Sequence, residues 1–184
     1  MRARILGMGL AVIGLGIAHS SFSTAQEKLP EPGVEHKLLA KLEGTWSAKV
    51  KSWLEPGKPP EESSGIMIRK MILDGRYLEE RYSGTALGKP FKGMGIFGYD
   101  LELKKYFMSW IDNFGTGLMV SYGAYDPKTK AWSYLSEEEG PGGKLKIRDV
   151  LRMISDDELR FEMYRTPPDN KEVKIMEITY TRKK

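Results

Sequence analysis

The sequence has no cysteine and only two histidines, His19 and His36, among its 184 residues. Without cysteine the chain can form no disulfide framework, no thiolate zinc or iron–sulfur site and no thiol nucleophile. The two histidines do not make the short-spaced pair typical of metal sites, and no Gly-x-Ser-x-Gly nucleophile motif or phosphate-binding loop is present. We therefore expect no catalytic residues, no metal and no cofactor.

The sequence also lacks a hydrophobic run long enough to cross a membrane. Its main apolar stretch, Ile5 to Ala18, is shorter than the roughly 20 residues of a spanning helix. Arg2 and Arg4 precede this stretch and the small residues Ser23-Thr24-Ala25 follow it, as in a secretory signal peptide. An uncleaved anchor helix is the alternative, although four glycines in the stretch weaken it. We predict a secreted or periplasmic protein without a membrane span, with a signal peptide over 1–25 cleaved after Ala25, a linker over 26–33 and one domain over 34–184.

The excess of positive over negative charge in the sequence is small. The formal net charge is +4, and two of the basic residues belong to the predicted signal peptide. Basic residues do not cluster with aromatic ones, and Arg182-Lys183-Lys184 is most simply a solvated chain end. We expect no nucleic-acid partner.

Beyond Trp46, prolines separate short strand-like segments. The prolines fall between apolar or alternating runs, as expected if they are confined to turns. The connections are too short for crossover helices, so neighbouring strands must pair antiparallel. The pattern predicts ten strands, near residues 45–54, 63–73, 76–86, 91–99, 105–112, 116–125, 131–137, 144–154, 158–165 and 172–182.

Residues 144–153 show the clearest alternation, with apolar side chains at every second position except Asp149, and Lys or Arg between most of them. One face of this strand is therefore buried and the other solvated. Asp149 falls on the buried face, where an unpaired carboxylate is costly. It needs an arginine such as Arg81, a tyrosine hydroxyl, water or a ligand as its partner.

The only helical pattern precedes the strands and ends at Gly44. We expect it to place His36 on the exposed side of the helix, where a role as haem ligand is disfavoured. We predict that the helix covers one end of the fold and that Trp46 closes this end beneath it. The apolar face of the helix consists of Val34, Leu38, Leu39 and Leu42.

Ten antiparallel strands in one domain form either a sandwich or a barrel. Closure into a barrel removes unpaired edge strands, and Gly93, Gly95 and Gly98 would permit the bending that closure requires. We predict an all-β fold, a closed antiparallel up-and-down barrel of about ten strands with one short N-terminal helix. A barrel of more than eight strands is wide enough to enclose a cavity.

Several segments resemble a known family. Gly44-Thr45-Trp46 is similar to the Gly-x-Trp opening of lipocalin-type barrels. In their order and spacing, further segments resemble the bacterial family called domain of unknown function 1579 over nearly all of residues 35–183. The chain has Asp74-Gly75-Arg76 where the family pattern has Gly-Gly-Arg. The resemblance implies a lipocalin-like, calycin-type barrel and brings no catalytic residues. The matching segments are Leu73-Asp74-Gly75-Arg76-Tyr77-Leu78-Glu79-Glu80, Phe91-Lys92-Gly93-Met94-Gly95, Gly98-Tyr99-Asp100, Trp110-Ile111-Asp112 and Met176-Glu177-Ile178-Thr179-Tyr180-Thr181-Arg182.

Charged and aromatic residues within the strand-like runs are candidates for the wall of a ligand cavity. Asp149 either forms a structural ion pair or orients a ligand. The candidate ligand-binding residues are Glu79, Arg81, Trp110, Asp112, Tyr122, Asp149 and Glu177.

Three functional hypotheses follow from this pattern. The first is an exported, non-enzymatic protein, monomeric or weakly self-associating, that binds a small, mostly apolar molecule in the barrel interior. The second is a non-catalytic structural or interaction module of the cell envelope with a closed barrel. The third is a hydrolase-like enzyme that uses interior carboxylates.

Overall fold

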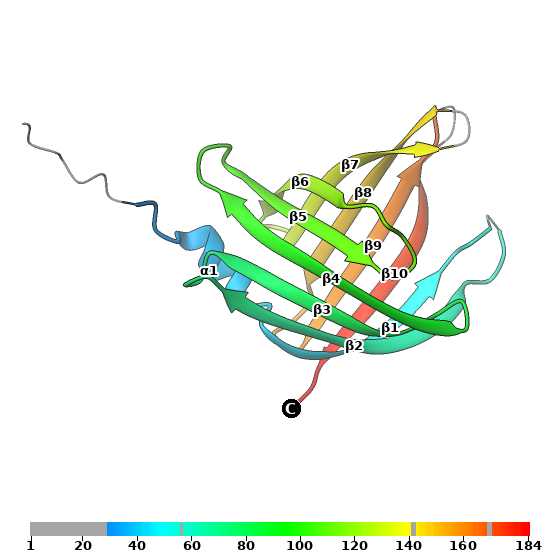
Figure 1. Ribbon diagram of the computed structural model, residues 1–184, viewed down its shortest axis with the longest axis horizontal. Coiled ribbons are helices and arrows are strands. Elements are labelled where there is room, and N and C mark those ends of the chain that lie inside the picture. The colour runs from blue at the N-terminus through cyan, green and yellow to red at the C-terminus, as the bar shows by residue number, and fades with distance from the viewer. Residues whose placement is uncertain (1–28, 56, 141–142, 169–170) are drawn as a thin grey trace, which may run out of the picture.

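Ten antiparallel strands pair in sequence order, and the first strand also pairs with the last, which closes the sheet into a barrel (Figure 1). The computed structural model describes residues 29–55, 57–140, 143–168 and 171–184. The predicted signal peptide and the start of the predicted linker lie outside the described residues. The elements are α1 (Val34–Ala40), β1 (Gly44–Ser52), β2 (Glu61–Ile72), β3 (Tyr77–Ala86), β4 (Lys89–Asp100), β5 (Lys105–Asp112), β6 (Met119–Asp126), β7 (Ala131–Gly140), β8 (Gly143–Met153), β9 (Glu158–Thr166) and β10 (Val173–Arg182).

The predicted all-β barrel with one short helix is confirmed, because each predicted segment matches one strand with small differences at its ends. The expectation that prolines lie only between strands is wrong for Pro90. This residue is the second of β4 and pairs with Thr85 beside the β3–β4 turn. Proline is tolerated there because the strand has only just begun.

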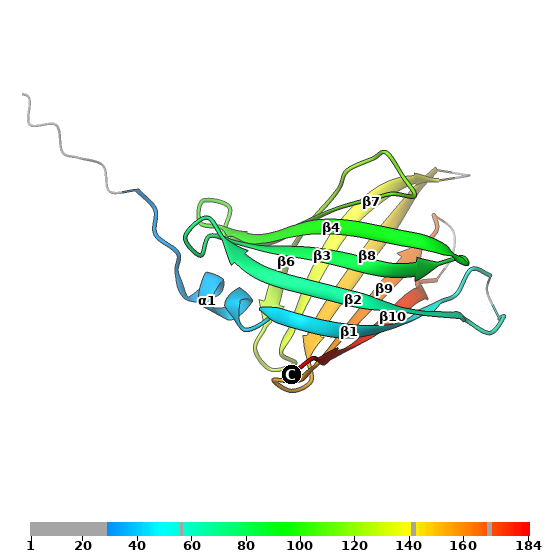
Figure 2. The same cartoon turned by 60° about the horizontal axis from the view of Figure 1, so that its bottom comes forward.

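The two ends of the barrel differ. The β2–β3, β4–β5, β6–β7 and β8–β9 turns lie at the same end as α1, and the remaining connections lie at the opposite end (Figures 1 and 2). Asp100 and Asp126 begin two of the turns at the α1 end. The Asp100 carboxylate accepts hydrogen bonds from the backbone N–H groups of Glu102 and Leu103, and the Asp126 carboxylate accepts one from Lys128. Both aspartates therefore stabilise their turns.

Helix α1 covers its end of the barrel and contacts β3 and β4. Leu39 of α1, Leu42 in the turn after it and Trp46 of β1 are fully buried in the same hydrophobic cluster. The indole Nε1 of Trp46 donates a hydrogen bond of 3.0 Å to the carbonyl oxygen of Leu42. The guanidinium of Arg182, at the end of β10, stacks over the Trp46 ring at 4.0 Å and donates to the carbonyl oxygens of Glu43 and Lys41. Trp46 therefore lies at the junction of the α1–β1 turn, β1 and β10.

The buried face of α1 differs from the predicted one. Val34 is exposed and His36 is buried, so the expected exposure of His36 is corrected. His36 Nδ1 accepts a hydrogen bond of 3.0 Å from the backbone N–H of Gly33, and its ring lies edge-on to Tyr99 at 6.1 Å. Desolvation lowers the pKa of His36 below its ordinary value. The imidazole is thus neutral and caps the helix. Because His36 is buried for this contact, the buried face of α1 includes a polar residue and differs from the purely apolar face that was predicted.

The glycines of β4 make room for neighbouring rings. A Cβ atom on Gly93 would overlap the indole of Trp110, and one on Gly98 would overlap the ring of Phe107. Neither glycine has a positive φ angle. Both glycines therefore admit large side chains from β5, and their predicted part in bending the strand stays a prediction.

Candidate functional site

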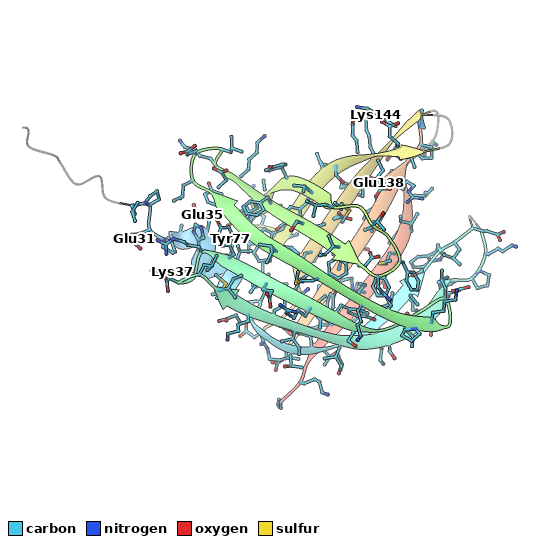
Figure 3. The ribbon with its side chains drawn as sticks, in the orientation of Figure 1. Glu31, Glu35, Lys37, Tyr77, Glu138 and Lys144 are labelled. Carbon is cyan, nitrogen blue, oxygen red and sulfur yellow. The ribbon has the colours of Figure 1, made fainter. Side chains whose placement is uncertain are left out.

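The barrel encloses a cavity of about 1430 Å³ that is lined by residues from most of the strands and from the loops at the end opposite α1. Glu138, on β7, marks this open end, and Glu35 and Lys37 of α1 mark the sealed end (Figure 3). We call the open end the mouth and the inner end, toward α1, the floor. The mouth is bordered by exposed apolar side chains, namely Leu54, Leu87, Phe114, Leu118 and Val173.

The walls of the cavity are mainly apolar, with flexible methionine side chains beside aromatic rings. Burial of such side chains against a ligand of irregular shape is favourable because thioethers adapt their conformation. The wall therefore suits an apolar molecule and sets no strict shape for it. Its apolar members include Met67, Phe97, Met108, Leu151, Phe161, Met163, Met176 and Ile178.

Trp110 and Asp112 lie on the inner face of β5 and line the cavity near the mouth. The indole Nε1 of Trp110 donates a hydrogen bond of 3.0 Å to Oδ2 of Asp112. The other carboxylate oxygen, Oδ1, accepts bonds from the backbone N–H groups of Phe114 and Gly115 at 2.9 and 3.1 Å. Asp112 thus stabilises the start of the β5–β6 loop and fixes the orientation of the Trp110 ring.

The floor contains a buried ion pair that the sequence reasoning missed. Arg69 on β2 and Glu80 on β3 are directly opposite each other, and Arg69 Nε donates to Glu80 Oε2 at 2.9 Å. Both side chains are almost completely buried, and the face of the Tyr180 ring lies 4.5 Å from the Arg69 guanidinium carbon. The sequence did contain a signal for this pair. A four-residue turn over Leu73–Arg76 sets a hairpin register in which residues 69 and 80 face each other.

Tyr180 and Tyr134 lie beside this ion pair, and Tyr82 is the next inward residue of β3 toward the mouth. The hydroxyl groups of Tyr82 and Tyr134 are buried and form no hydrogen bond with the described residues, and the same holds for Arg69 Nη1. Desolvation raises the pKa of Tyr82, and it raises that of Tyr134 well above its ordinary value with a further contribution from the Glu80 charge. These phenols therefore stay protonated and can donate hydrogen bonds.

Asp149 points inward from β8 and is fully buried, but it does not belong to the residues that line the cavity. It pairs in register with Tyr134 on one side and Met163 on the other. Neither carboxylate oxygen has a hydrogen-bond partner among the described residues, so the expected ion pair with Arg81 is not formed. Desolvation, with a smaller effect of the Glu138 charge, raises the pKa of Asp149 to about 7.

Four of the predicted cavity residues face the outside of the barrel, and the expectation for them is corrected. Glu79 binds Arg81 through two hydrogen bonds of 2.6 and 3.0 Å on the outer face of β3. Tyr122 is 45% exposed and packs beside Phe107. Glu177 forms an outer ion pair with Lys174.

The four residues were assigned to the wrong face because side chains of a strand alternate between its two faces with a period of two residues. A strand assigned to the wrong parity turns every side chain to the opposite face. In β3 the inward residues are Leu78, Glu80 and Tyr82, so a carboxylate does enter the barrel there, but it is the neighbour of the predicted one.

No group of three or more His, Asp or Glu side chains in the described part of the chain could hold a metal ion. Within the same residues, no helix is long and apolar enough to cross a membrane.

The fold and the cavity define the class as a lipocalin-like antiparallel barrel with an internal cavity. The chain belongs to the family described as protein of unknown function DUF1579, whose model matches residues 31–182. A search of curated proteins finds no match.

Two solved structures share the fold at low sequence identity. The protein Rv2717c from M. tuberculosis is 14% identical, with a TM-score of 0.59 over 84% of this chain and 100% of its own. The S-type phycobiliprotein lyase CPES from Guillardia theta is 11% identical, with a TM-score of 0.55 over 84% of this chain and 94% of its own. Both likenesses concern the barrel alone.

Proposed function

We propose that the protein binds a small, mostly apolar molecule inside the barrel. The observation that carries this proposal is the cavity of about 1430 Å³, which exceeds the roughly 300–1,000 Å³ of common ligand pockets. Its apolar walls supply a hydrophobic driving force, and the polar groups on its floor supply orientation. The apolar border of the mouth suits the entry of such a ligand.

The other two hypotheses have less support. A closed structural module needs an interior filled by its own side chains, whereas this interior leaves a large open volume. A hydrolase needs a carboxylate that is free to take up or release a proton beside the substrate. Glu80 is bound to Arg69, and Asp112 is occupied by Trp110 and two backbone N–H groups. The shared fold of the phycobiliprotein lyase CPES does not alter this balance, since a fold does not imply an activity.

Filling the cavity is expected to abolish binding. Ser136 lines the cavity from the inner face of β7, so Ser136→Trp places an indole in the space that the ligand would occupy. We expect binding of the uncharged apolar dye Nile red, followed by its fluorescence, to weaken by at least about tenfold, which corresponds to roughly 1.4 kcal/mol.

The matched control is Leu135→Trp. Leu135 is the neighbouring residue on β7, and its side chain is 62% exposed on the outer face. The control should bind Nile red as the unchanged protein does. Equal affinity in both variants, with both folded by circular dichroism, would place the dye outside the barrel and contradict the proposal.

We further infer that the protein is exported, with cleavage after Ala25. The support is the basic start, the short apolar stretch and the small residues before the cleavage site in the sequence. Expression of the full chain in a bacterial host should give a periplasmic product whose N-terminal sequence starts at Gln26. Replacing Ala25 with a bulky residue, as in Ala25→Phe, should block this cleavage. A product that begins at Met1 in the unchanged chain would overturn the inference.

A further inference from the structure

The floor of the cavity carries a balanced charge. Arg69 and Glu80 neutralise each other through the contact of 2.9 Å, and both are more than nine-tenths buried. A buried ion pair in this state has no net charge to offer a ligand. Any charge that a ligand brings to the floor must therefore be stabilised by other groups.

No other described residue on the cavity wall offers an uncompensated positive charge. The two remaining basic residues of the wall are Arg165 and Lys174. Arg165 Nη2 lies 3.4 Å from Glu138 Oε2. Lys174 Nζ lies 3.2 Å from Glu162 Oε1 and is also paired with Glu177, on the outer side of the sheet. Acidic residues are more numerous on the wall, namely Glu61, Glu62, Glu80, Asp112, Glu137 and Glu138.

The hydrogen-bonding groups left over at the floor are donors. Arg69 Nη1 and the hydroxyl group of Tyr82 belong to residues that line the cavity, and both are buried without a partner among the described residues. The Tyr134 hydroxyl is likewise unpartnered among these residues, but Tyr134 does not line the cavity. A guanidinium N–H can only donate, and a protonated phenol is a good donor. Buried donors of this kind need an acceptor, and a neutral oxygen supplies one without adding a net charge to a floor whose ion pair is already balanced.

We propose that the ligand is an uncharged amphiphile, with a long apolar body and one neutral oxygen acceptor such as a hydroxyl, ketone or ester group, and that the cavity disfavours free carboxylates. The acceptor binds at the floor near Arg69, and the apolar body extends along the methionine-rich wall toward the mouth. A carboxylate in the same place would lie beside Glu80 in a medium of low dielectric constant, where repulsion between like charges is strong. This inference rests on the proposed function and adds the chemical class of the ligand.

Displacement of Nile red by three compounds with the same twelve-carbon chain tests the proposal. The compounds are 1-dodecanol, methyl dodecanoate and dodecanoate, used at pH 8 below their aggregation concentrations. We expect the alcohol and the ester to displace the dye at least about tenfold more effectively than the carboxylate. Equal or stronger displacement by the carboxylate would overturn the inference and leave the proposed function intact. Failure of the dye and of all three compounds to bind would overturn both.

A pair of variants on β3 tests the role of charge balance. Glu80→Gln removes the counter-charge of Arg69 and keeps the shape of the side chain, so it should improve binding of dodecanoate relative to dodecanol by about tenfold or more. Glu79→Gln changes the same residue type at the adjacent, outward position and should leave this ratio as it is. An unchanged ratio in a folded Glu80→Gln protein would contradict the assignment of the floor. Should this variant not fold, the ratio measured on the unchanged protein decides the matter.

Discussion

Replacing Trp46 with alanine is expected to lower the free energy of unfolding by about 3–5 kcal/mol, as for other fully buried aromatic residues. Three kinds of contact are lost together. The indole is buried in the same cluster as Leu39 and Leu42, donates a hydrogen bond to the Leu42 carbonyl oxygen and stacks against the Arg182 guanidinium. Equilibrium unfolding in urea, monitored by far-ultraviolet circular dichroism, measures the loss.

Two variants control this experiment. Trp53→Ala removes an indole that is only partly buried, near the mouth, so the loss of stability should be clearly smaller. Trp46→Phe keeps most of the apolar contact and removes the N–H donor, so its effect should lie between those of the two alanine variants. If Trp46→Ala and Trp53→Ala destabilise equally, Trp46 does not seal the end of the barrel.

The charge state of Asp149 should make the protein less stable as the pH rises. The pKa of this carboxyl is about 7 in the folded protein, against an ordinary value of 3.8. Between these values the folded protein keeps a proton that the unfolded chain has lost, so the free energy of unfolding falls as the pH increases. The contribution is complete below the ordinary pKa and is lost as the pH rises through about 7. At about 1.36 kcal/mol per pKa unit, the full loss is on the order of 4 kcal/mol.

Asp149→Asn removes this titration while keeping the size of the side chain. We therefore expect the stability of the variant, relative to the unchanged protein, to rise by about 4 kcal/mol between pH 4 and pH 8. Urea unfolding at several pH values measures the difference. Asp156→Asn, in an exposed turn, is the control and should show no such trend. A parallel pH dependence in the unchanged protein and in Asp149→Asn would mean that the buried carboxyl is ionised throughout.

Much of the architecture could be predicted because turns are local. The prolines and the aspartates of the turns separate ten runs, and short connections allow only antiparallel neighbours. The position of Asp149 on the inner face was also predictable, since most of its strand alternates between apolar and basic residues. The direction of a side chain is less certain where both faces of a strand contain polar residues. In β3 this ambiguity led to the prediction that Glu79 and Arg81 face the interior, whereas the inward charged residue is Glu80.

The composition of the floor depends on contacts between distant strands. Arg69 and Glu80 could have been paired by extending the register outward from the turn at Asp74 and Gly75. The approach of Tyr134 and Tyr180 to this pair could not, because these residues lie on strands that reach it only when the barrel closes. Local periodicity contains no information about which strands face each other across an interior.

Both described chain ends lie on the sealed side of the barrel, because β10 finishes beside the start of β1 and the backbone N–H of Lys183 donates to the Thr45 carbonyl oxygen at 2.8 Å. A tether attached before α1 or after β10 therefore holds the barrel with its mouth turned away from the attachment point. Surface immobilisation through either end should leave ligand exchange unobstructed. A reporter domain fused there can be as large as the barrel without standing in the path of the ligand.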